Sequence, residues 1–339
     1  MKKQLFLVAC AAFALSSCSE KETVEMPDSA AIGFSTFVGN PTRGGELKTD
    51  DLTEFYVFGG IDTYNDIFND QKVEKSGDSW IYSPLRYWEA GKTYTFNAYA
   101  PTLPEGAEPS VNTNGGIDIA DFTQGDGDNN LDLLVAAKQT KTMDATISTE
   151  PGVVQFTFSH ILSMVKFTFV SEFGDGVTVT VSNVKLKGVK SKGSYVANPT
   201  AVWTMADPAV TTVDYTMSNS DITLTSADVE GKSSLGAIVI PQVLTDDAVT
   251  VEFNVKAVYT GTDNVVNGVD GTYVVKATLP ASQNWEIAYR YNYVAKLNAV
   301  NTQNPEEPTT LYPIQFALAD DGVTAWTDYT EGGNVTVGE

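Results

Sequence analysis

The sequence predicts an all-β protein, and three observations carry that prediction. Apolar and polar residues alternate with a period of two in many segments from Ala30 onward, as on a strand with one buried and one solvated face. These segments are rich in Val, Thr, Tyr and Phe, whereas Gly, Asn, Asp and Pro fill the gaps between them. No comparable segment keeps a helical repeat over three turns. We therefore expect many antiparallel strands.

The predicted strands follow one another along most of the chain. After a short first strand at 30–39 they are EFYVFGGI (54–61), KTYTFNAYA (92–100), VVQFTF (153–158), VKFTFV (165–170), VTVTVSNVKLKGV (177–189), LGAIVIP (235–241), VTVEFNVKAVYT (249–260), GTYVVKATL (271–279), YRYNYVAKLNAV (289–300) and YPIQFALA (312–319). The stretch from Pro101 to Asn130 is rich in Pro, Gly, Asn and Asp and is typical of long surface loops.

The chain length of 339 residues allows two domains of ordinary size. Glu150-Pro151-Gly152 interrupts the strand pattern, so we predict an N-terminal β domain over 30–149 and a C-terminal β domain over 150–339. A polar break at Asn301–Thr310 precedes the tail strands, 311–339, of the second domain.

The N-terminus has the pattern of an export signal. Two lysines precede an apolar core of roughly a dozen residues, which is too short for a membrane span. The segment Leu15-Ser16-Ser17-Cys18 resembles a bacterial lipobox, which implies a signal peptide over 1–17, a lipid on Cys18 and a polar tether over 18–29. An ordinary export signal that ends near a cysteine is the alternative.

Cysteine and histidine content restricts the chemistry of the mature chain. Cys10 would leave with the signal, so Cys18 could form no internal disulfide and no cysteine nucleophile would remain. The chain has one histidine, His160, between two strand-like halves, where a structural role is favoured over catalysis. We expect no enzyme activity and no cofactor.

A calcium loop is the one metal site that the sequence raises. Oxygen-bearing side chains alternate at Asp126, Asp128, Asn130 and Asp132, but the sixth-position glycine and twelfth-position acid of a calcium loop are missing. A solvated loop is the favoured interpretation, and we expect no metal.

Net charge argues against a nucleic-acid partner. The 21 basic and 43 acidic residues give a formal charge of −22, and no basic run interrupts the acidic surface. A polyanion would be repelled.

Seven weak motifs, in order, resemble those of the fimbrillin family, the lipoprotein subunits of type V pili. They are the lipobox; Asn40-Pro41-Thr42-Arg43-Gly44; Phe55-Tyr56-Val57-Phe58-Gly59-Gly60 with Tyr87-Trp88 and YTFNAYA; Asp132-Leu133-Leu134-Val135-Ala136; Phe156-Thr157-Phe158-Ser159-His160-Ile161-Leu162-Ser163 with VKFTF; Tyr289-Arg290-Tyr291-Asn292-Tyr293; and Ile314 to Thr327 with Trp326-Thr327-Asp328. The resemblance spans nearly the whole chain. It rests on the order of the motifs, since none is specific alone.

The resemblance implies two transthyretin-like β-sandwich domains in series. It also implies that an arginine-specific protease cuts after Arg43, before Gly44, and that the first strand then departs with the lipid. An extended segment of another fimbrillin subunit would fill the groove left behind. The alternative is that Arg43 is a solvated turn residue.

The residues of the first strand fit such a groove. Ile32, Phe34, Thr36 and Val38 share one face of a strand, and Gly33, Ser35 and Phe37 the other. Removing the strand would expose apolar surface and unpaired backbone groups, which a donor strand could satisfy by β-augmentation. Burial of each apolar side chain contributes roughly 1.5 to 3 kcal/mol.

The C-terminal tail is a weaker candidate donor. Val335 and Val337 are its main apolar residues, so a donor would also need the predicted strand 311–319, which contains Ile314 and Phe316. The stalk, tip and anchor roles therefore stay open.

The leading hypothesis is a structural subunit or adhesin of a fimbria at the cell outer membrane, with other subunits, the protease, membrane lipid and a host or bacterial surface ligand as partners. The alternative is a monomeric glycan-binding lipoprotein, which would use exposed tryptophans. The candidates for stacking sugars are Trp80, Trp88, Trp203, Trp285 and Trp326, although burial in sandwich cores is the favoured interpretation for most of them. A hydrolase is the weakest hypothesis.

Overall fold

The computed structural model confirms the all-β prediction. It describes residues 31–38, 51–61, 63–145, 152–197, 200–206, 212–244, 249–264, 266, 273–279, 284–299 and 316–325. These residues form four β-sheets and a short 3-10 turn (η2, Gly127–Asn129), and none of them lies in an α-helix. No helix in the described part could therefore cross a membrane.

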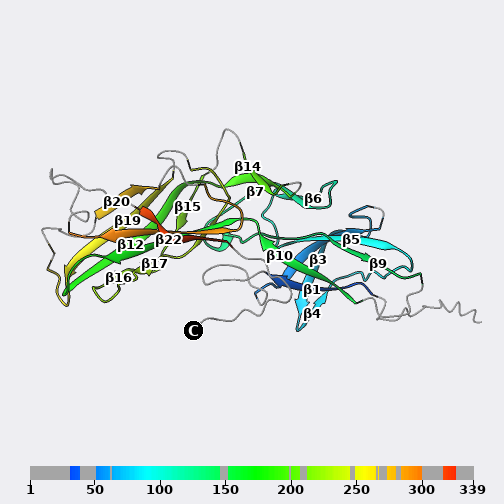
Figure 1. Ribbon diagram of the computed structural model, residues 1–339, viewed down its shortest axis with the longest axis horizontal. Helices are drawn as coiled ribbons and strands as arrows, with labels where there is room; N and C mark the ends of the chain where they lie inside the picture. Colours follow the sequence, from blue (N-terminus) through cyan, green and yellow to red (C-terminus); the bar gives the residue numbers. More distant parts are fainter. Residues whose placement is uncertain are drawn as a thin grey trace, which may run out of the picture.

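The first sheet lies at one end of an elongated molecule (Figure 1). Its strands, in spatial order, are β1 (Gly33–Val38), β10 (Val153–His160), β8 (Leu134–Ala136), β5 (Thr93–Ala100), β2 (Glu54–Gly60), β3 (Phe68–Ser76) and β4 (Ser79–Ile81), and β9 (Gln139–Thr142) also pairs with β5. All its pairs are antiparallel except β1 with β10. The sheet encloses an aromatic core, which we call the first core.

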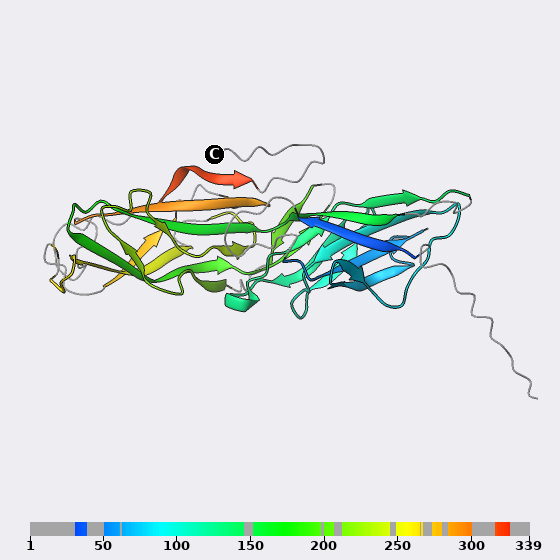
Figure 2. The ribbon, with the colours of Figure 1, turned by 90° about the horizontal axis from the view of Figure 1, so that it is seen from below.

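Two further sheets form the other end of the molecule, visible as separate layers in Figure 2. One contains β17 (Lys232–Ser233), β11 (Ser163–Ser171), β21 (Tyr289–Leu297) and β22 (Phe316–Ala325), with β18 (Ala237–Val239) also on β11. The other contains β15 (Thr212–Thr216), β12 (Val177–Lys190), β19 (Thr250–Tyr259) and β20 (Tyr273–Thr278), with β16 (Ile222–Leu224) also on β12. A hydrophobic core lies between the two sheets.

Two bulges keep the apolar side of the long strand β12 facing this core. Val177, Val179 and Val181 are buried, but the register shifts after Ser182, where Asn183 adopts a φ of 52°. Buried positions therefore move to Val184 and Leu186, since one extra residue exchanges the two faces of a strand. A second shift, beside Gly188 with a φ of 74°, restores the original alternation at Val189. Left-handed conformations suit Asn and Gly at these points.

The fourth sheet joins the two halves of the chain. It contains β14 (Val202–Met205), β13 (Lys192–Val196), β7 (Ile117–Thr123) and β6 (Glu108–Val111), so strands from both predicted domains pair directly. Its apolar side chains pack with Phe58 and Tyr99 of the first sheet and with Met164 of β11. The indole of Trp203 donates a hydrogen bond to the Ile161 carbonyl at 2.6 Å. This third core therefore holds the two halves of the chain together, and we call the region the junction.

The observed strand pairing does not follow the predicted domain boundary between residues 149 and 150. Strand β10 follows that point, yet it pairs with β1 and β8 of the first sheet. The chain passes into the next sheet at Ile161 and Leu162, immediately after β10. A Pro-Gly break marks a turn in the sequence, but strand pairing decides which sheet the next strand joins. The transthyretin-like arrangement stays a prediction.

The junction hydrogen bond should contribute measurably to stability. We expect Trp203→Phe to lower the free energy of unfolding by about 1–3 kcal/mol, because the buried Ile161 carbonyl loses its donor. Urea unfolding would measure the loss. Trp80→Phe is the matched control, since none of the described hydrogen bonds uses its indole nitrogen, and it should lose less. Equal losses in the two variants would contradict this account of the junction.

Candidate functional site

Strand β1 lies at an edge of the first sheet. It pairs with β10 in continuous parallel register from Gly33 opposite Val153 to Val38 opposite Phe158. On its other side, the Ile32 amide donates to the Arg86 carbonyl at 2.8 Å, and Ala31 forms an isolated bridge with Tyr87. In the described part, β1 is therefore held along its length on one side and near its start on the other.

Tyr82 reinforces the attachment near the start of β1. Its hydroxyl donates to the Ile32 carbonyl at 2.7 Å and accepts from the Arg86 amide at 3.2 Å. Burial raises the pKa of Tyr82 above its usual value, although the hydrogen bond with the Arg86 backbone opposes the shift. Folding therefore favours the neutral form of Tyr82. Its contribution to stability is complete below about pH 10, the usual pKa of tyrosine, and is lost as the pH rises through the pKa of the folded state.

The side chain of Phe34 fills the middle of the first core. Ile32 and Phe34 are 1% and 5% exposed, respectively. Five aromatic rings surround Phe34, with ring centroids at 5.5 Å (Phe68 and Tyr82), 5.8 Å (Phe156) and 6.1 Å (Phe55 and Phe96). Such contacts contribute about 0.5–1.5 kcal/mol each beyond area burial. Loss of β1 would therefore leave a groove lined by aromatic rings.

The other positions of β1 are less buried. Gly33, Ser35 and Thr36 are half-buried. A Cβ at Gly33 would lie 3.1 Å from Cγ1 of Val153, which is itself 50% exposed. The backbone of Phe37 and Val38 belongs to β1, but their side chains lie outside the described part.

Most of the other predicted site residues lie outside the described residues: Cys18, Arg43, Gly44, Ile314, Val335 and Val337. Phe316 is the first residue of β22, where its backbone pairs with Ala295 of β21. The structure thus places Phe34 and Thr36 on β1, with Ile32 immediately before the strand, and it places Phe316 in a different sheet.

His160 lies in the interior at the end of β10. It is 2% exposed, and its Nδ1 lies 2.9 Å from Oδ1 of Asp132, which is 3% exposed. This buried pair fixes the loop before β8 against β10 and offers no open site for a substrate.

The residues of the loop considered for calcium mostly have other partners. Asp126 accepts from the Thr216 amide, Asn130 hydrogen-bonds the Ile238 backbone, and Asp132 pairs with His160. The oxygens at 126, 130 and 132 therefore attach the loop to three different neighbours rather than converging on one point.

The tryptophans of the described part do not form an exposed cluster. Trp88, Trp203 and Trp285 are buried, and Trp80 is half-buried with its ring 4.9 Å from that of Phe55. Trp326 lies outside the described residues.

The contribution of Tyr82 and Arg86 does not follow from the sequence pattern. Both lie in the irregular segment after β4, where no periodic pattern indicates a contact with a strand some 50 residues earlier in the chain. The segment YSPLRYW offers only its concentration of aromatic residues as a signal.

Comparison with known proteins identifies the family. The sequence family described as fimbrillin-like matches residues 42–310, which is more than half of the chain. The chain belongs to the fimbrillin-like family. The family resemblance predicted from the ordered motifs is therefore confirmed.

A curated relative and two solved structures are similar to this chain. The "Fimbrium subunit Fim1C" of Phocaeicola vulgatus is 30% identical over 216 residues, covering 55% of this chain and 57% of the relative. The chain thus spans little more than half the length of that fimbrillin-like relative. A candidate cell adhesion protein from Bacteroides uniformis shares the fold, with a TM-score of 0.50 and 14% identity over 89% of this chain and 100% of the other. A second such protein, from Bacteroides ovatus, gives a TM-score of 0.49 with 17% identity over 88% and 98% of the chains.

Removal of the Phe34 ring should destabilise the first core. We expect Phe34→Ala to lower the free energy of unfolding by about 3–5 kcal/mol, because the surrounding rings cannot close the cavity fully. Urea unfolding of the full chain would measure the effect. The control is Ser35→Ala on the opposite face of β1, which should change stability by less than about 0.5 kcal/mol. Similar values for both variants would show that β1 contributes little to the core.

Proposed function

We propose that this protein is a structural subunit or adhesin of a cell-surface fimbria of the type V class. Subunits would assemble by donor-strand exchange after lipoprotein export and cleavage at Arg43. The observation that carries the proposal is the placement of Phe34, on an edge strand near the N-terminus, at the centre of the first core. The family assignment and the name of the Fim1C relative support it.

Strand exchange requires a strand that is both removable and replaceable. Strand β1 precedes Arg43 in the sequence, so one cut after Arg43 would separate it from β2. Its departure would expose the edge of β10 from Val153 to Phe158 together with the aromatic rings around Phe34. A donor segment could restore both the backbone hydrogen bonds and the apolar contacts.

The donor of this chain would come from its C-terminal region. Its candidate residues are Ile314, Phe316, Val335 and Val337. Strand β22 pairs with β21 from Phe316 onward, so the use of Phe316 as donor would require release of that pairing. A tip or accessory position, in which β22 stays paired, is compatible with the same geometry.

The remaining parts of the proposal concern location and partners. A lipid on Cys18 would hold the precursor in the outer membrane, and an arginine-specific protease would release it for assembly with other fimbrillin subunits. The two halves of the chain would form two transthyretin-like sandwiches. The family is one of structural subunits, which supports a non-enzymatic role. The tryptophan-based glycan-binding alternative has no support from the buried positions of Trp88, Trp203 and Trp285.

Processing can be tested in cells that display the fimbria. We expect the N-terminus of the surface protein to be Gly44 and unboiled samples to form an SDS-resistant ladder. Arg43→Ala should keep the N-terminus at Cys18 and abolish the ladder, because β1 would stay in its groove. The matched control is Lys48→Ala, a nearby basic residue in the same segment, which should leave both unchanged. A ladder that persists in Arg43→Ala would refute cleavage-dependent exchange.

A further inference from the structure

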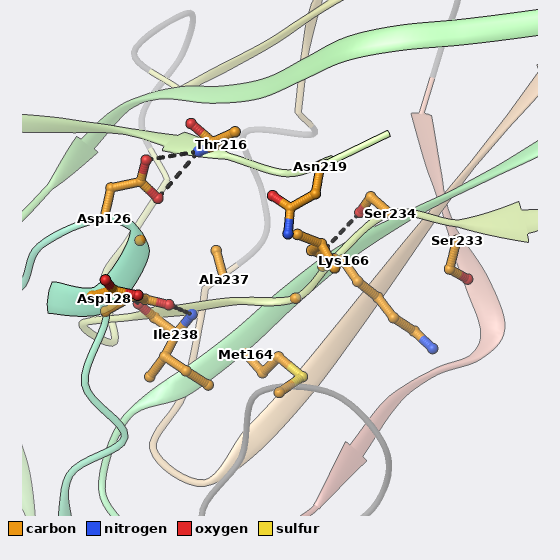
Figure 3. A pocket seen from close by; sticks show the side chains of 14 residues that line it. Asp126, Asp128, Met164, Lys166, Thr216, Asn219, Ser233, Ser234, Ala237 and Ile238 are labelled. Atoms are coloured by element: carbon orange, nitrogen blue, oxygen red, sulfur yellow. Dashed lines mark hydrogen bonds between the residues drawn. The ribbon is translucent and has the colours of Figure 1, made fainter. Parts of the chain in front are cut away.

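A second candidate site lies away from β1, beside the edge of the sheet that contains β11. It is an open hollow of about 690 Å³ (Figure 3). Three chain segments and β11 form its walls: the loop 126–130, the turn at 216–219, the run 233–238, and Met164 with Lys166. Among the described side chains of β1, none lines it.

The backbone edge in this hollow is already occupied by internal hydrogen bonds. The Leu235 amide donates to the Met217 carbonyl at 2.8 Å. The Asn130 side chain accepts from the Ile238 amide at 2.9 Å and donates to the Ile238 carbonyl at 2.7 Å. An extended peptide therefore finds its pairing positions blocked at both ends, and the hollow suits a compact ligand instead.

Some polar side chains of the hollow fix its walls. Both carboxylate oxygens of Asp126 accept from the Thr216 amide, at 3.1 and 3.2 Å. Ser234 donates to the Leu235 carbonyl and accepts from the Phe167 amide. These bonds hold the loop, the turn and the strand edge in place around the space.

Three other polar side chains are available to a ligand. Asp128, Lys166 and Asn219 come from three different segments, and no hydrogen bond or ion pair of their side chains occurs within the described part. In the view of Figure 3, Asp128 lies at the left, Asn219 lies nearer the centre, and the Lys166 side chain extends to the right, away from Asp128. Leu235, which is 45% exposed, adds an apolar surface.

We propose that this hollow binds a neutral oligosaccharide. A carboxylate accepts, an ammonium group donates and an amide does both, which matches the mixed donor and acceptor pattern of sugar hydroxyls. The charged residues of the lining are Asp126, Asp128 and Lys166, so their net charge of −1 disfavours an acidic ligand and requires no charge on a neutral one. The C–H face of the sugar can contact Leu235. The volume lies within the roughly 300–1,000 Å³ of small-molecule sites.

The test is binding of the full-length chain to an array of immobilised neutral and acidic oligosaccharides, followed by titration with each retained compound. We expect retention of neutral saccharides. Asp128→Asn and Asn219→Ala should each weaken the binding about tenfold, because the first replaces a charged acceptor by a neutral amide and the second removes a hydrogen-bonding group. Both residues are exposed, so the variants should fold. The matched control is Asp78→Asn in the exposed turn between β3 and β4, which should bind normally.

Three results would overturn this proposal: no neutral saccharide is retained, only acidic saccharides are retained, or both hollow variants bind as tightly as the unchanged chain. None of them would bear on strand exchange, because none of the described residues of β1 lines this hollow.

Discussion

The packing of Phe34 among five aromatic rings is the interaction on which the rest of the first sheet depends. Those rings come from β2, β3, β10, β5 and the segment after β4, so one side chain of an edge strand contacts much of the sheet. An estimated 3–5 kcal/mol for that ring is a large share of a typical stability of about 5–15 kcal/mol. The first core therefore depends on this edge strand, although among the described strands the backbone of β1 forms a ladder with β10 alone.

The junction has the opposite character. The pairing of β7 with β13 connects distant parts of the sequence, and the Trp203 indole and the Gln124 amide reach carbonyls of other elements, at Ile161 and Ile238. Separation of the halves would break a β-ladder and leave buried carbonyls without donors, which is costly. The two halves should therefore behave as one body while β1 remains the exchangeable part.

The sequence predicted what depends on local alternation and left out what depends on long-range pairing. The all-β class and the burial of Ile32 and Phe34 followed from period-two patterns. The pairing of β10 with β1 could not be predicted, because parallel pairing of residues as distant as Gly33 and Val153 leaves no pattern in the sequence around either one. The role of Tyr82 depends on an irregular segment, and the hollow at Asp128, Lys166 and Asn219 depends on three segments that meet only after folding.

The most direct measurement is strand replacement in a chain cut after Arg43. Residues 30–39 would be added as a synthetic peptide after the cut chain has been freed of its own strand. This account predicts that the cut chain unfolds at a lower temperature and that the peptide restores the midpoint, since a ligand of the folded state stabilises it. A peptide with Phe34→Ala should bind roughly 150- to 5,000-fold more weakly, which corresponds to the loss of about 3–5 kcal/mol. An unchanged unfolding temperature after removal of the strand, or equal binding of the unchanged and Phe34→Ala peptides, would contradict the exchange of β1.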